Sequence, residues 1–357
     1  MTVAATEPGL TQGDARTVSP YFSVTHDHTP GSTRELPSRV PRVAVVGAGF
    51  VGSTTAYALL LSGTASEIVL IDRNKRRAEG HAHDLRDAEV FSHSTRVVVG
   101  DFGDCCTSDV IILTAGLGQG SRKSRLEGLK ETAAMIKGLV LDVARYNPRG
   151  ILLIASNPVD VLTYAAWKWS GLPASRVIGS GTSLDTSRFR RRLAEKYGVS
   201  SDNVHAYIIG EHGDSQVPVI SSARVAGMPL QGFCRELALP ADEENSLDKI
   251  ATETRAAGLE IITAKGATYF GIGAALARIV SAILRNEHAV LAVSSLVPES
   301  LGLGEVSLSL PSIINRDGVA RVLSIPLDQA EKQALHQSAD IVKQHIATLD
   351  LTVGGKG

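Results

Sequence analysis

The chain has 357 residues, of which 43% are hydrophobic, and 36 Lys and Arg residues stand against 37 Asp and Glu residues. This balance lacks the basic excess that draws proteins to phosphate backbones, so we expect no nucleic-acid partner. A chain of this length folds as about two domains and buries enough surface to need no disulfide or metal for stability. These properties predict a soluble globular protein.

The cysteines indicate the redox compartment. Cys105, Cys106 and Cys234 are odd in number and form neither a disulfide framework nor a paired metal-binding motif. This pattern is typical of a reducing environment, so we expect a cytoplasmic protein with no metal site.

Residues 1–40 differ in composition from the rest of the chain. They contain Gly, Pro, Ser and Thr with scattered charges, and they lack the patterns of a secretory signal and of a transit peptide. We interpret them as a disordered tail or as an arm that docks on a neighbouring subunit. No apolar stretch of the chain reaches the roughly 18 residues of a membrane-spanning helix, so we expect no membrane partner.

Short apolar runs recur through the first half of the chain and predict buried strands. The segments between them are long enough for crossover helices, which predicts a Rossmann-type α/β fold with a doubly wound parallel sheet. We assign residues 41–180 to this dinucleotide-binding domain. The predicted strands are Val43–Val46, Glu67–Asp72, Val97–Val99, Val110–Leu113 and Ile151–Ile154.

The alternation of strands and helices weakens after about Gly179. The remaining sequence predicts several helices, closing antiparallel strands and a final helix that ends near Ile346. We assign residues 181–357 to a second, α+β substrate domain, with the ligand cleft between the two halves. The internal helices predicted here are Thr186–Tyr197, Glu243–Ala264 and Ile272–Asn286.

A glycine-rich motif follows the first predicted strand. The glycines permit a tight turn and close approach of a pyrophosphate to the start of a helix, so we expect Gly47, Gly49, Val51 and Gly52 to bind the cofactor. Asp72 ends the next strand about 20 residues further on, where an acid accepts hydrogen bonds from ribose hydroxyls. A carboxylate there repels a 2′-phosphate, which favours NAD over NADP, although the neighbouring Arg73 weighs in the other direction. A glycine-rich turn that binds nothing is the less favoured interpretation.

A second group of residues predicts catalysis. His212 lies between Glu211 and Gly213 in a polar turn, where a histidine acts as a proton donor near neutral pH. Asp185 could orient His212, and Arg188, three residues later on the same helical face, could hold a carboxylate by a two-pronged hydrogen bond. A lone histidine is more often structural, and it is these companions that favour a catalytic role.

From Val43 to Ile346 the chain resembles the NAD-dependent lactate/malate dehydrogenase family, because the family's motifs recur in the right order. The resemblance implies that His212 is the acid/base catalyst, Asp185 its partner and Arg188 the carboxylate anchor. It also implies that Asn157 holds substrate and nicotinamide side by side. The motifs are Gly-Ala-Gly-Phe-Val-Gly, Thr-Ala-Gly (Thr114, Ala115 and Gly116, implied to bind the cofactor), Ser-Asn-Pro-Val-Asp, Leu-Asp-Thr-Ser-Arg-Phe-Arg and Gly-Glu-His-Gly-Asp.

The resemblance also bears on the substrate. Arg125 resembles the arginine of a mobile loop that polarises the substrate carbonyl, Gln119 occupies the specificity position, and Thr268 closes the other side of that pocket. A neutral Gln119 suits pyruvate, which implies reversible hydride transfer between NADH and pyruvate to give L-lactate, as in glycolysis and fermentation. Arg122 and Lys123 replace the usual Gly-Glu of lactate enzymes, so malate dehydrogenase activity, or a broader 2-hydroxyacid activity, is the alternative.

Two basic residues in the second half of the chain bear on regulation. Arg190 and His205 match positions at which related bacterial enzymes bind fructose 1,6-bisphosphate, which implies an allosteric homotetramer, whereas the alternative is a solvated basic helix face. A metal-dependent glycosidase would need a Cys/His cluster that the sequence lacks. A non-enzymatic NAD-sensing module would not need His212, Asp185 and Arg188 together.

Overall fold

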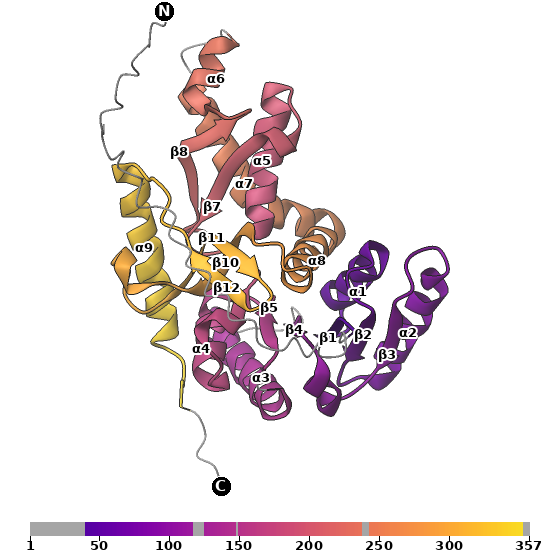
Figure 1. The fold of residues 1–357 in the computed structure, drawn as a ribbon. Helices are drawn as coiled ribbons and strands as arrows, with labels where there is room; N and C mark the ends of the chain where they lie inside the picture. The colour runs from indigo at the N-terminus through magenta and orange to yellow at the C-terminus, as the bar shows by residue number, and fades with distance from the viewer. Residues whose placement is uncertain (1–39, 117–124, 148, 238–242, 353–357) are drawn as a thin grey trace, which may run out of the picture. The chain divides into compact units, whose positions relative to one another are not determined.

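The structure, a computed structural model, describes residues 40–116, 125–147, 149–237 and 243–352. The segment predicted as a tail or docking arm therefore lies outside the described residues, apart from Val40. The central element is a nine-stranded sheet in the order β12-β11-β10-β6-β5-β4-β1-β2-β3 (Figure 1). Its strands are β1 (Arg42–Val46), β2 (Glu67–Ile71), β3 (Arg96–Val99), β4 (Val110–Leu113), β5 (Ile151–Ile154), β6 (Val177–Gly179), β10 (Ala289–Leu296), β11 (Ser307–Asn315) and β12 (Gly318–Val322).

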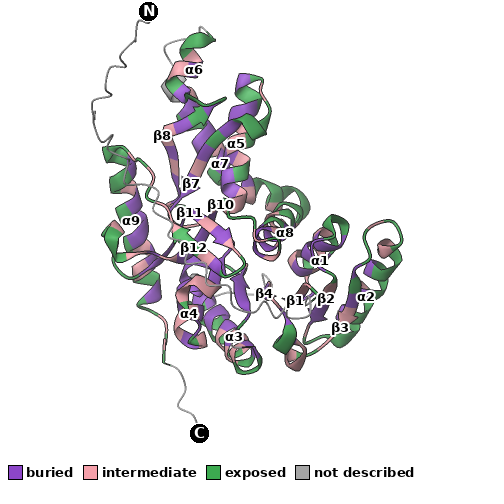
Figure 2. Cartoon of the chain, in the orientation of Figure 1, coloured by how far each residue is buried: buried purple, intermediate pink, exposed green. Residues whose placement is uncertain are grey.

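Strands β1 to β6 are parallel and follow the order β3-β2-β1-β4-β5-β6, which is the order of a dinucleotide-binding fold. Alternate residues of each strand point to opposite faces. In β1, Val43 and Val45 belong to one apolar cluster, and Ala44 and Val46 belong to the other. Because helices cover both faces, most residues of β1, β2, β4, β5 and β6 are buried, whereas the edge strand β3 is partly exposed (Figure 2). This confirms the predicted doubly wound fold.

The helices of this part follow the strands in the expected alternation. Residues of α1, α2 and α8 contribute to the first apolar cluster, and residues of α3 and α4 contribute to the second. Helices α1 and α8 pack closely, because Gly273 of α8 faces Thr54 of α1 and a Cβ at Gly273 would lie 2.8 Å from the Thr54 side chain. The helices are α1 (Phe50–Ser62), α2 (Lys75–Glu89), α3 (Arg125–Tyr146), α4 (Val159–Ser170) and α8 (Phe270–Leu284).

The antiparallel strands that the sequence predicts near the end of the chain extend the same sheet. Strand β10 pairs with β6 antiparallel at Ser294 and Gly179, and β11 and β12 continue from it. These strands therefore join the parallel sheet, although they follow the segment where the alternation of strands and helices weakens. Strand β6 is not predicted from the sequence, because a strand of three residues is too short to stand out as an apolar run.

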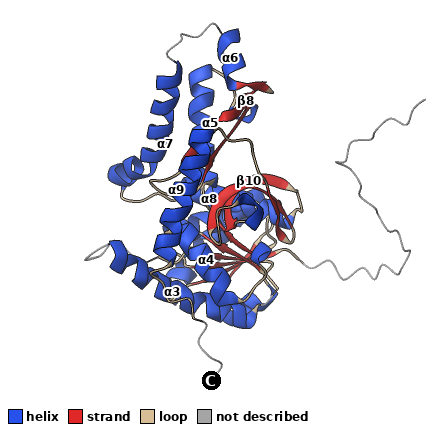
Figure 3. Cartoon of the chain, turned by 90° about the vertical axis from the view of Figure 1, so that its left-hand side faces the viewer, coloured by secondary structure: helices blue, strands red, loops and turns tan. Residues whose placement is uncertain are grey.

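A second sheet has three antiparallel strands, with α5 beside it and α7 packed against α5 (Figure 3). The helix predicted from Thr186 begins three residues earlier, at Ser183. Among the described residues, no helix combines the length and the apolar character needed to cross a bilayer. The elements are β7 (Val204–Ile209), β8 (Val217–Val225), β9 (Met228–Pro229), α5 (Ser183–Tyr197), α6 (Leu230–Glu236), α7 (Glu243–Lys265), α9 (Gln329–Ile346) and the short 3₁₀ helices η1 (Phe102–Thr107), η2 (Ala174–Arg176), η3 (Ser201–Asn203) and η4 (Glu299–Leu301).

Candidate active site

The predicted cofactor residues gather where neighbouring parallel strands end. In the sheet, Val46 lies opposite Ile71 and Leu113, so the segments that follow β1, β2 and β4 meet at one edge. Backbone hydrogen bonds hold them together: the Gly47 N–H donates to Ile71 O at 2.8 Å, and the Thr114 N–H donates to Val46 O at 2.9 Å. This edge, at the point where the strand order reverses, is where nucleotides bind in open α/β sheets.

The three glycines of the turn have different reasons to be glycine. A Cβ at Gly52 would lie 1.8 Å from Gly47 O, and Gly47 itself has φ +105° with Ala115 N only 2.8 Å from its Cβ position. Gly49 meets nothing within 4 Å and is the N-cap of α1. Crowding therefore requires Gly47 and Gly52, whereas Gly49 leaves open space in front of a helix N-terminus, which fits a pyrophosphate.

The rest of the predicted cofactor set surrounds this turn. Thr114 Oγ1 donates to Gly47 O at 2.7 Å, and Ala115 and Gly116 follow it along the chain. Val51 is half-buried in the first turn of α1. Asn157 is exposed in the segment between β5 and α4, at the same end of the sheet.

Asp72 follows β2 and faces the glycine-rich turn. Its Oδ2 accepts a hydrogen bond from the Ala48 N–H at 2.7 Å, its Oδ1 accepts one from the Asn74 N–H at 2.8 Å, and Arg77 forms an ion pair with both oxygens. Burial raises the pKa of Asp72, but the hydrogen bonds from Asn74, Arg77 and Ala48 outweigh it and hold the pKa below the usual value. The carboxylate therefore stays charged, as an acceptor for ribose hydroxyls must be.

The predicted catalytic pair is formed. His212 follows β7 and Asp185 lies in the first turn of α5, and the Nδ1–H of His212 donates to Asp185 Oδ2 at 2.5 Å. This bond leaves Nε2 as the nitrogen that can exchange a proton with a ligand. The His212 side chain is 29% exposed while that of Asp185 is 5% exposed, so the pair is buried on the carboxylate side and open on the imidazole side.

The charges around the pair favour a protonated imidazole. Burial lowers the pKa of His212, but the hydrogen bond and charge of Asp185, together with the charge of Asp160, raise it above the usual value. Burial raises the pKa of Asp185, and His212 and Arg188 lower it by more, so that the carboxylate stays ionised. His212 is therefore suited to donate a proton near neutral pH.

The structure adds Asp160 to this group. Asp160 is the last residue of the Ser-Asn-Pro-Val-Asp motif, and the sequence alone gives it no role of its own. Asp160 is fully buried in the first turn of α4, and its Oδ2 accepts the backbone N–H of His212 at 2.7 Å. Its Oδ1 accepts the Ser309 hydroxyl at 3.2 Å, and Ser309 Oγ accepts the N–H of Thr182, the N-cap of α5. Burial raises the pKa of Asp160 to about 6, and the hydrogen bond from the His212 backbone limits the rise.

Arg188 lies beside the catalytic pair. Its Nη1 donates to Asp185 Oδ1 at 3.0 Å, and its side chain is half-buried. Because one guanidinium carries five N–H donors in a planar fork, this single bond leaves donors for a substrate carboxylate. The predicted trio of His212, Asp185 and Arg188 is therefore brought together.

Thr268 is half-buried and precedes α8. Its neighbour Tyr269 stacks on Phe50, the first residue of α1, with ring centroids 5.2 Å apart. The segment that carries Thr268 therefore lies next to the glycine-rich turn. Gln119, Arg122 and Lys123 lie outside the described residues, and Arg125 begins α3 with a side chain that is not described.

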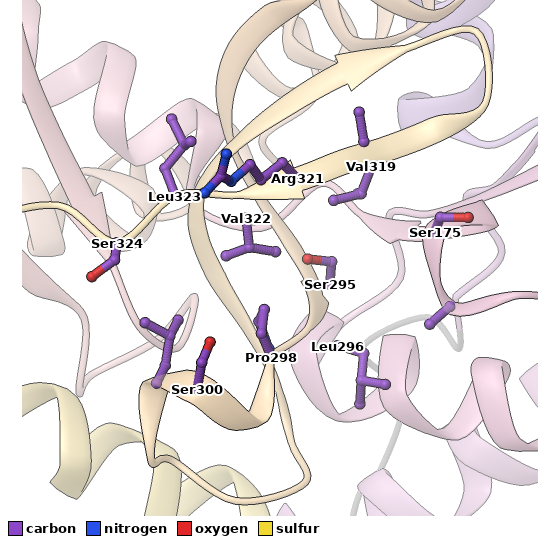
Figure 4. A pocket seen from close by; sticks show the side chains of 13 residues that line it. Ser175, Ser295, Leu296, Pro298, Ser300, Val319, Arg321, Val322, Leu323 and Ser324 are labelled. Carbon is purple, nitrogen blue, oxygen red and sulfur yellow. The ribbon is translucent and has the colours of Figure 1, made fainter. Parts of the chain in front are cut away.

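Neither His212 nor Asp185 lines either of two cavities in the described part of the chain. One of about 590 Å³ between β10, β12 and η4 is lined by apolar side chains with Ser295, Ser300, Ser324 and Arg321, and it contains none of the predicted site residues (Figure 4). A second, of about 520 Å³ between α5, α8 and β7, is lined by both predicted allosteric residues, Arg190 and His205. Within the described ranges, no group of three or more His, Cys, Asp or Glu side chains is placed to hold a metal.

The fold and the site define an NAD-dependent oxidoreductase: a glycine-rich turn and ribose acceptor at the switch point of a parallel sheet, with a proton-donating histidine and an arginine nearby. The comparisons with known proteins agree. The NAD-binding domain of lactate/malate dehydrogenase matches residues 41–179, and the alpha/beta C-terminal domain of the same family matches residues 182–350. The chain belongs to the lactate/malate dehydrogenase family, and its cofactor is NAD.

Relatives with curated names and solved structures agree as well. An L-lactate dehydrogenase of Acetivibrio thermocellus is 46% identical over 312 residues, which cover 87% of this chain and 98% of the relative. A probable L-lactate dehydrogenase of Schizosaccharomyces pombe is 44% identical over 90% of this chain and 96% of its own length. The structure of a minor L-lactate dehydrogenase from Enterococcus mundtii is 41% identical, with a TM-score of 0.85 over 88% of this chain and 100% of that one.

Proposed function

We propose that the protein is an L-lactate dehydrogenase. The enzyme reduces pyruvate to L-lactate with NADH, and in the reverse direction it oxidises L-lactate to pyruvate with NAD. The observation that carries the proposal is the presence in one chain of the His212–Asp185 pair, with Arg188 beside it, and of a complete dinucleotide turn. NADH bound at this turn supplies the hydride. The names of the relatives point to the same reaction.

The residues have distinct roles in this proposal. Arg188 binds the carboxylate of pyruvate, and His212 donates its Nε2 proton to the carbonyl oxygen as the hydride arrives. In the reverse direction His212 accepts the proton from lactate, and Asp185 stabilises the resulting imidazolium. Asn157 holds substrate and nicotinamide side by side, and Arg125 polarises the carbonyl. Thr268 bounds the pocket on one side.

The cofactor roles follow the geometry of the turn. Gly47, Gly49 and Gly52 bring the backbone and the N-terminus of α1 close to the pyrophosphate, and Asp72 accepts the ribose hydroxyls. The segment Thr114–Gly116 lines the edge between β1 and β4. We expect NADH to bind more tightly than NADPH, because Asp72 is ionised and repels a 2′-phosphate.

Gln119 is proposed to set the preference for pyruvate over oxaloacetate, because a neutral amide provides no cation for a second carboxylate. The test is steady-state NADH oxidation with pyruvate and with oxaloacetate, in the wild type and in Gln119→Arg. We expect the wild type to prefer pyruvate and the variant to shift toward oxaloacetate by about tenfold or more. A wild type that prefers oxaloacetate would instead indicate malate dehydrogenase activity, with Arg122 and Lys123 overriding Gln119.

We also propose a homotetramer that fructose 1,6-bisphosphate activates. The support is the cavity of about 520 Å³ lined by Arg190, His205 and Arg278. Arg190 is held there by a hydrogen bond from its Nε to Ala206 O at 2.8 Å, and its guanidinium lies 4.8 Å from the centre of the Tyr207 ring. Three cation-forming side chains around one cavity suit a polyphosphate.

The test of regulation is pyruvate saturation with and without millimolar fructose 1,6-bisphosphate, with the molar mass in solution measured under both conditions. We expect a lower KM and a tetramer with the effector, and loss of both responses in Arg190→Gln and His205→Gln. Identical wild-type saturation curves would remove this claim and leave the dehydrogenase proposal intact.

Within the same proposal, residues 41–180 and 181–357 form the cofactor and substrate domains of a cytoplasmic enzyme.

A further inference from the structure

The carboxylate that receives the ribose is fully engaged. Asp72 Oδ1 accepts hydrogen bonds from the Asn74 N–H at 2.8 Å and from Arg77 Nη2 at 2.9 Å. Asp72 Oδ2 accepts hydrogen bonds from the Ala48 N–H at 2.7 Å and from Arg77 Nη2 at 2.8 Å. A carboxylate offers about four acceptor sites, so these bonds fill it. With only 3% of the Asp72 side chain exposed, ribose hydroxyls find no acceptor while Arg77 is in place.

Arg77 is the partner that can leave. The other two donors are backbone groups, one in the glycine-rich turn and one just before α2, and the fold holds both of them. The Arg77 side chain projects from the first turn of α2 and is 46% exposed, so water can solvate it once it leaves Asp72. Binding of the NAD ribose therefore requires the Arg77–Asp72 ion pair to open.

A displaced Arg77 lies at the position that distinguishes the two cofactors. NADP differs from NAD by a phosphate on the ribose 2′-oxygen, and an arginine near this oxygen is the group that accommodates it. Once its two bonds to Asp72 have opened, all five N–H donors of the Arg77 guanidinium are available to a phosphate. The exposed Arg73, Lys75 and Arg76 add positive charge around the same segment.

We propose that Arg77 is a specificity-determining residue of the cofactor site. As an ion-pair partner it covers Asp72 and competes with the ribose hydroxyls of NAD, and as a free cation it binds the 2′-phosphate of NADP. The preference for NAD is therefore smaller in the wild type than Asp72 alone would produce. This inference rests on the family's cofactor site and is independent of the proposed substrate.

The test measures cofactor binding without turnover. The dissociation constants of NADH and NADPH are determined for the full chain by titrating the fluorescence of the bound nicotinamide, in the wild type, Arg77→Gln and Arg76→Gln. Arg76 is the matched control, because it is an exposed neighbouring cation that carries the same charge and makes no hydrogen bond to Asp72. The helix start is preserved in Arg77→Gln, because the bond to the Asn74 cap comes from the backbone N–H of residue 77.

We expect Arg77→Gln to bind NADH about two- to fivefold more tightly, because no exposed ion pair has to open. We expect the same variant to bind NADPH about tenfold more weakly, because a charge-assisted contact to the phosphate is lost. Arg76→Gln should change both constants by a similar, smaller factor. The proposal is overturned if Arg77→Gln changes the NADPH to NADH ratio no more than Arg76→Gln does, or if it weakens NADH binding. Failure to reduce pyruvate would affect only the proposed function.

Discussion

Arg188 illustrates how one side chain combines two tasks. It is half-buried, bonded to Asp185 through Nη1, and positioned with further donors beside His212. A planar guanidinium can hold Asp185 and a substrate carboxylate at once, whereas an ammonium is a point charge without that geometry. In the proposed function, the binding of the substrate carboxylate and the orientation of the His212–Asp185 pair are therefore linked at this residue.

We expect Arg188→Lys to raise KM for pyruvate by about tenfold or more, because the two-pronged contact with the carboxylate is lost. The measurement is pyruvate saturation at constant, saturating NADH, with the dissociation constant of NADH determined separately. NADH binding should stay near the wild-type value. An unchanged KM in a folded variant would remove the anchor role from Arg188.

The His212–Asp185 pair predicts a pH dependence. Because Asp185 raises the pKa of His212, the protonated form that reduces pyruvate persists to higher pH and is lost as pH rises through the raised value. In Asp185→Asn this support is removed, and the pKa of His212 moves down toward or below about 6.5.

The measurement is the pH profile of kcat/KM for pyruvate reduction, which reports groups of the free enzyme. We expect the alkaline limb of the profile to shift to lower pH in Asp185→Asn, along with a loss of activity. An unshifted alkaline limb would mean that another group supplies the proton. A shift to higher pH would contradict the assigned sign of the interaction.

At the scale of elements, Asp160 joins three segments that are distant in sequence. It belongs to α4, accepts the backbone N–H of His212 in the turn after β7, and accepts the hydroxyl of Ser309 in β11. Ser309 in turn caps the start of α5 through Thr182. The position of the catalytic pair therefore depends on a buried carboxylate that belongs to α4.

We expect Asp160→Ala to lower the free energy of unfolding by about 2–5 kcal/mol, because it leaves a buried backbone N–H and a buried hydroxyl without an acceptor. Chemical denaturation of this variant and of Asp84→Ala, an exposed helical aspartate, gives the comparison. The control should change stability by less than about 0.5 kcal/mol. Equal effects in the two variants would show that the buried network does not join these elements.

The glycine-rich turn allows a second prediction for an element. Gly49 has room for a Cβ and φ −79°, so we expect Gly49→Ala to keep the thermal midpoint near the wild-type value. The same methyl group enters the space proposed for the pyrophosphate, so NADH binding should weaken by about tenfold or more. Gly80→Ala, at a helical glycine that also has open space around it, is the control for NADH binding. If Gly49→Ala binds NADH normally, the pyrophosphate does not approach this face.

Sequence reasoning predicted the local elements better than the long-range contacts. The five strands of the cofactor half and the glycine-rich turn follow from apolar runs and short spacings, and the structure contains them. Residue types and motifs indicate His212, Asp185 and Arg188, and the structure brings these three together. Strand β6 is too short to stand out as an apolar run, and the pairing of β10 to β12 with the parallel sheet depends on contacts across many residues, which no local pattern encodes. The roles of Asp160 and Arg77 also depend on partners that only the folded chain brings together.

At the scale of the whole molecule, α8 connects the helix that follows the cofactor turn with the helix that carries Asp185. Gly273 of α8 packs against Thr54 of α1, and Gly271 of α8 packs against Leu184 of α5. Hydride transfer needs such a juxtaposition, because reacting groups must be held in near-attack geometry. The central claim is that this arrangement reduces pyruvate to L-lactate with His212 as the proton donor.

The most direct test follows NADH oxidation after pyruvate is added and identifies the product with a stereospecific assay, for the wild type and His212→Asn in parallel. We expect the wild type to form one L-lactate for each NADH oxidised, and we expect the variant to lose about 10²- to 10⁴-fold in rate while it binds NADH normally. The account would be contradicted by a wild type that does not oxidise NADH with pyruvate, or by a variant that turns over at the wild-type rate.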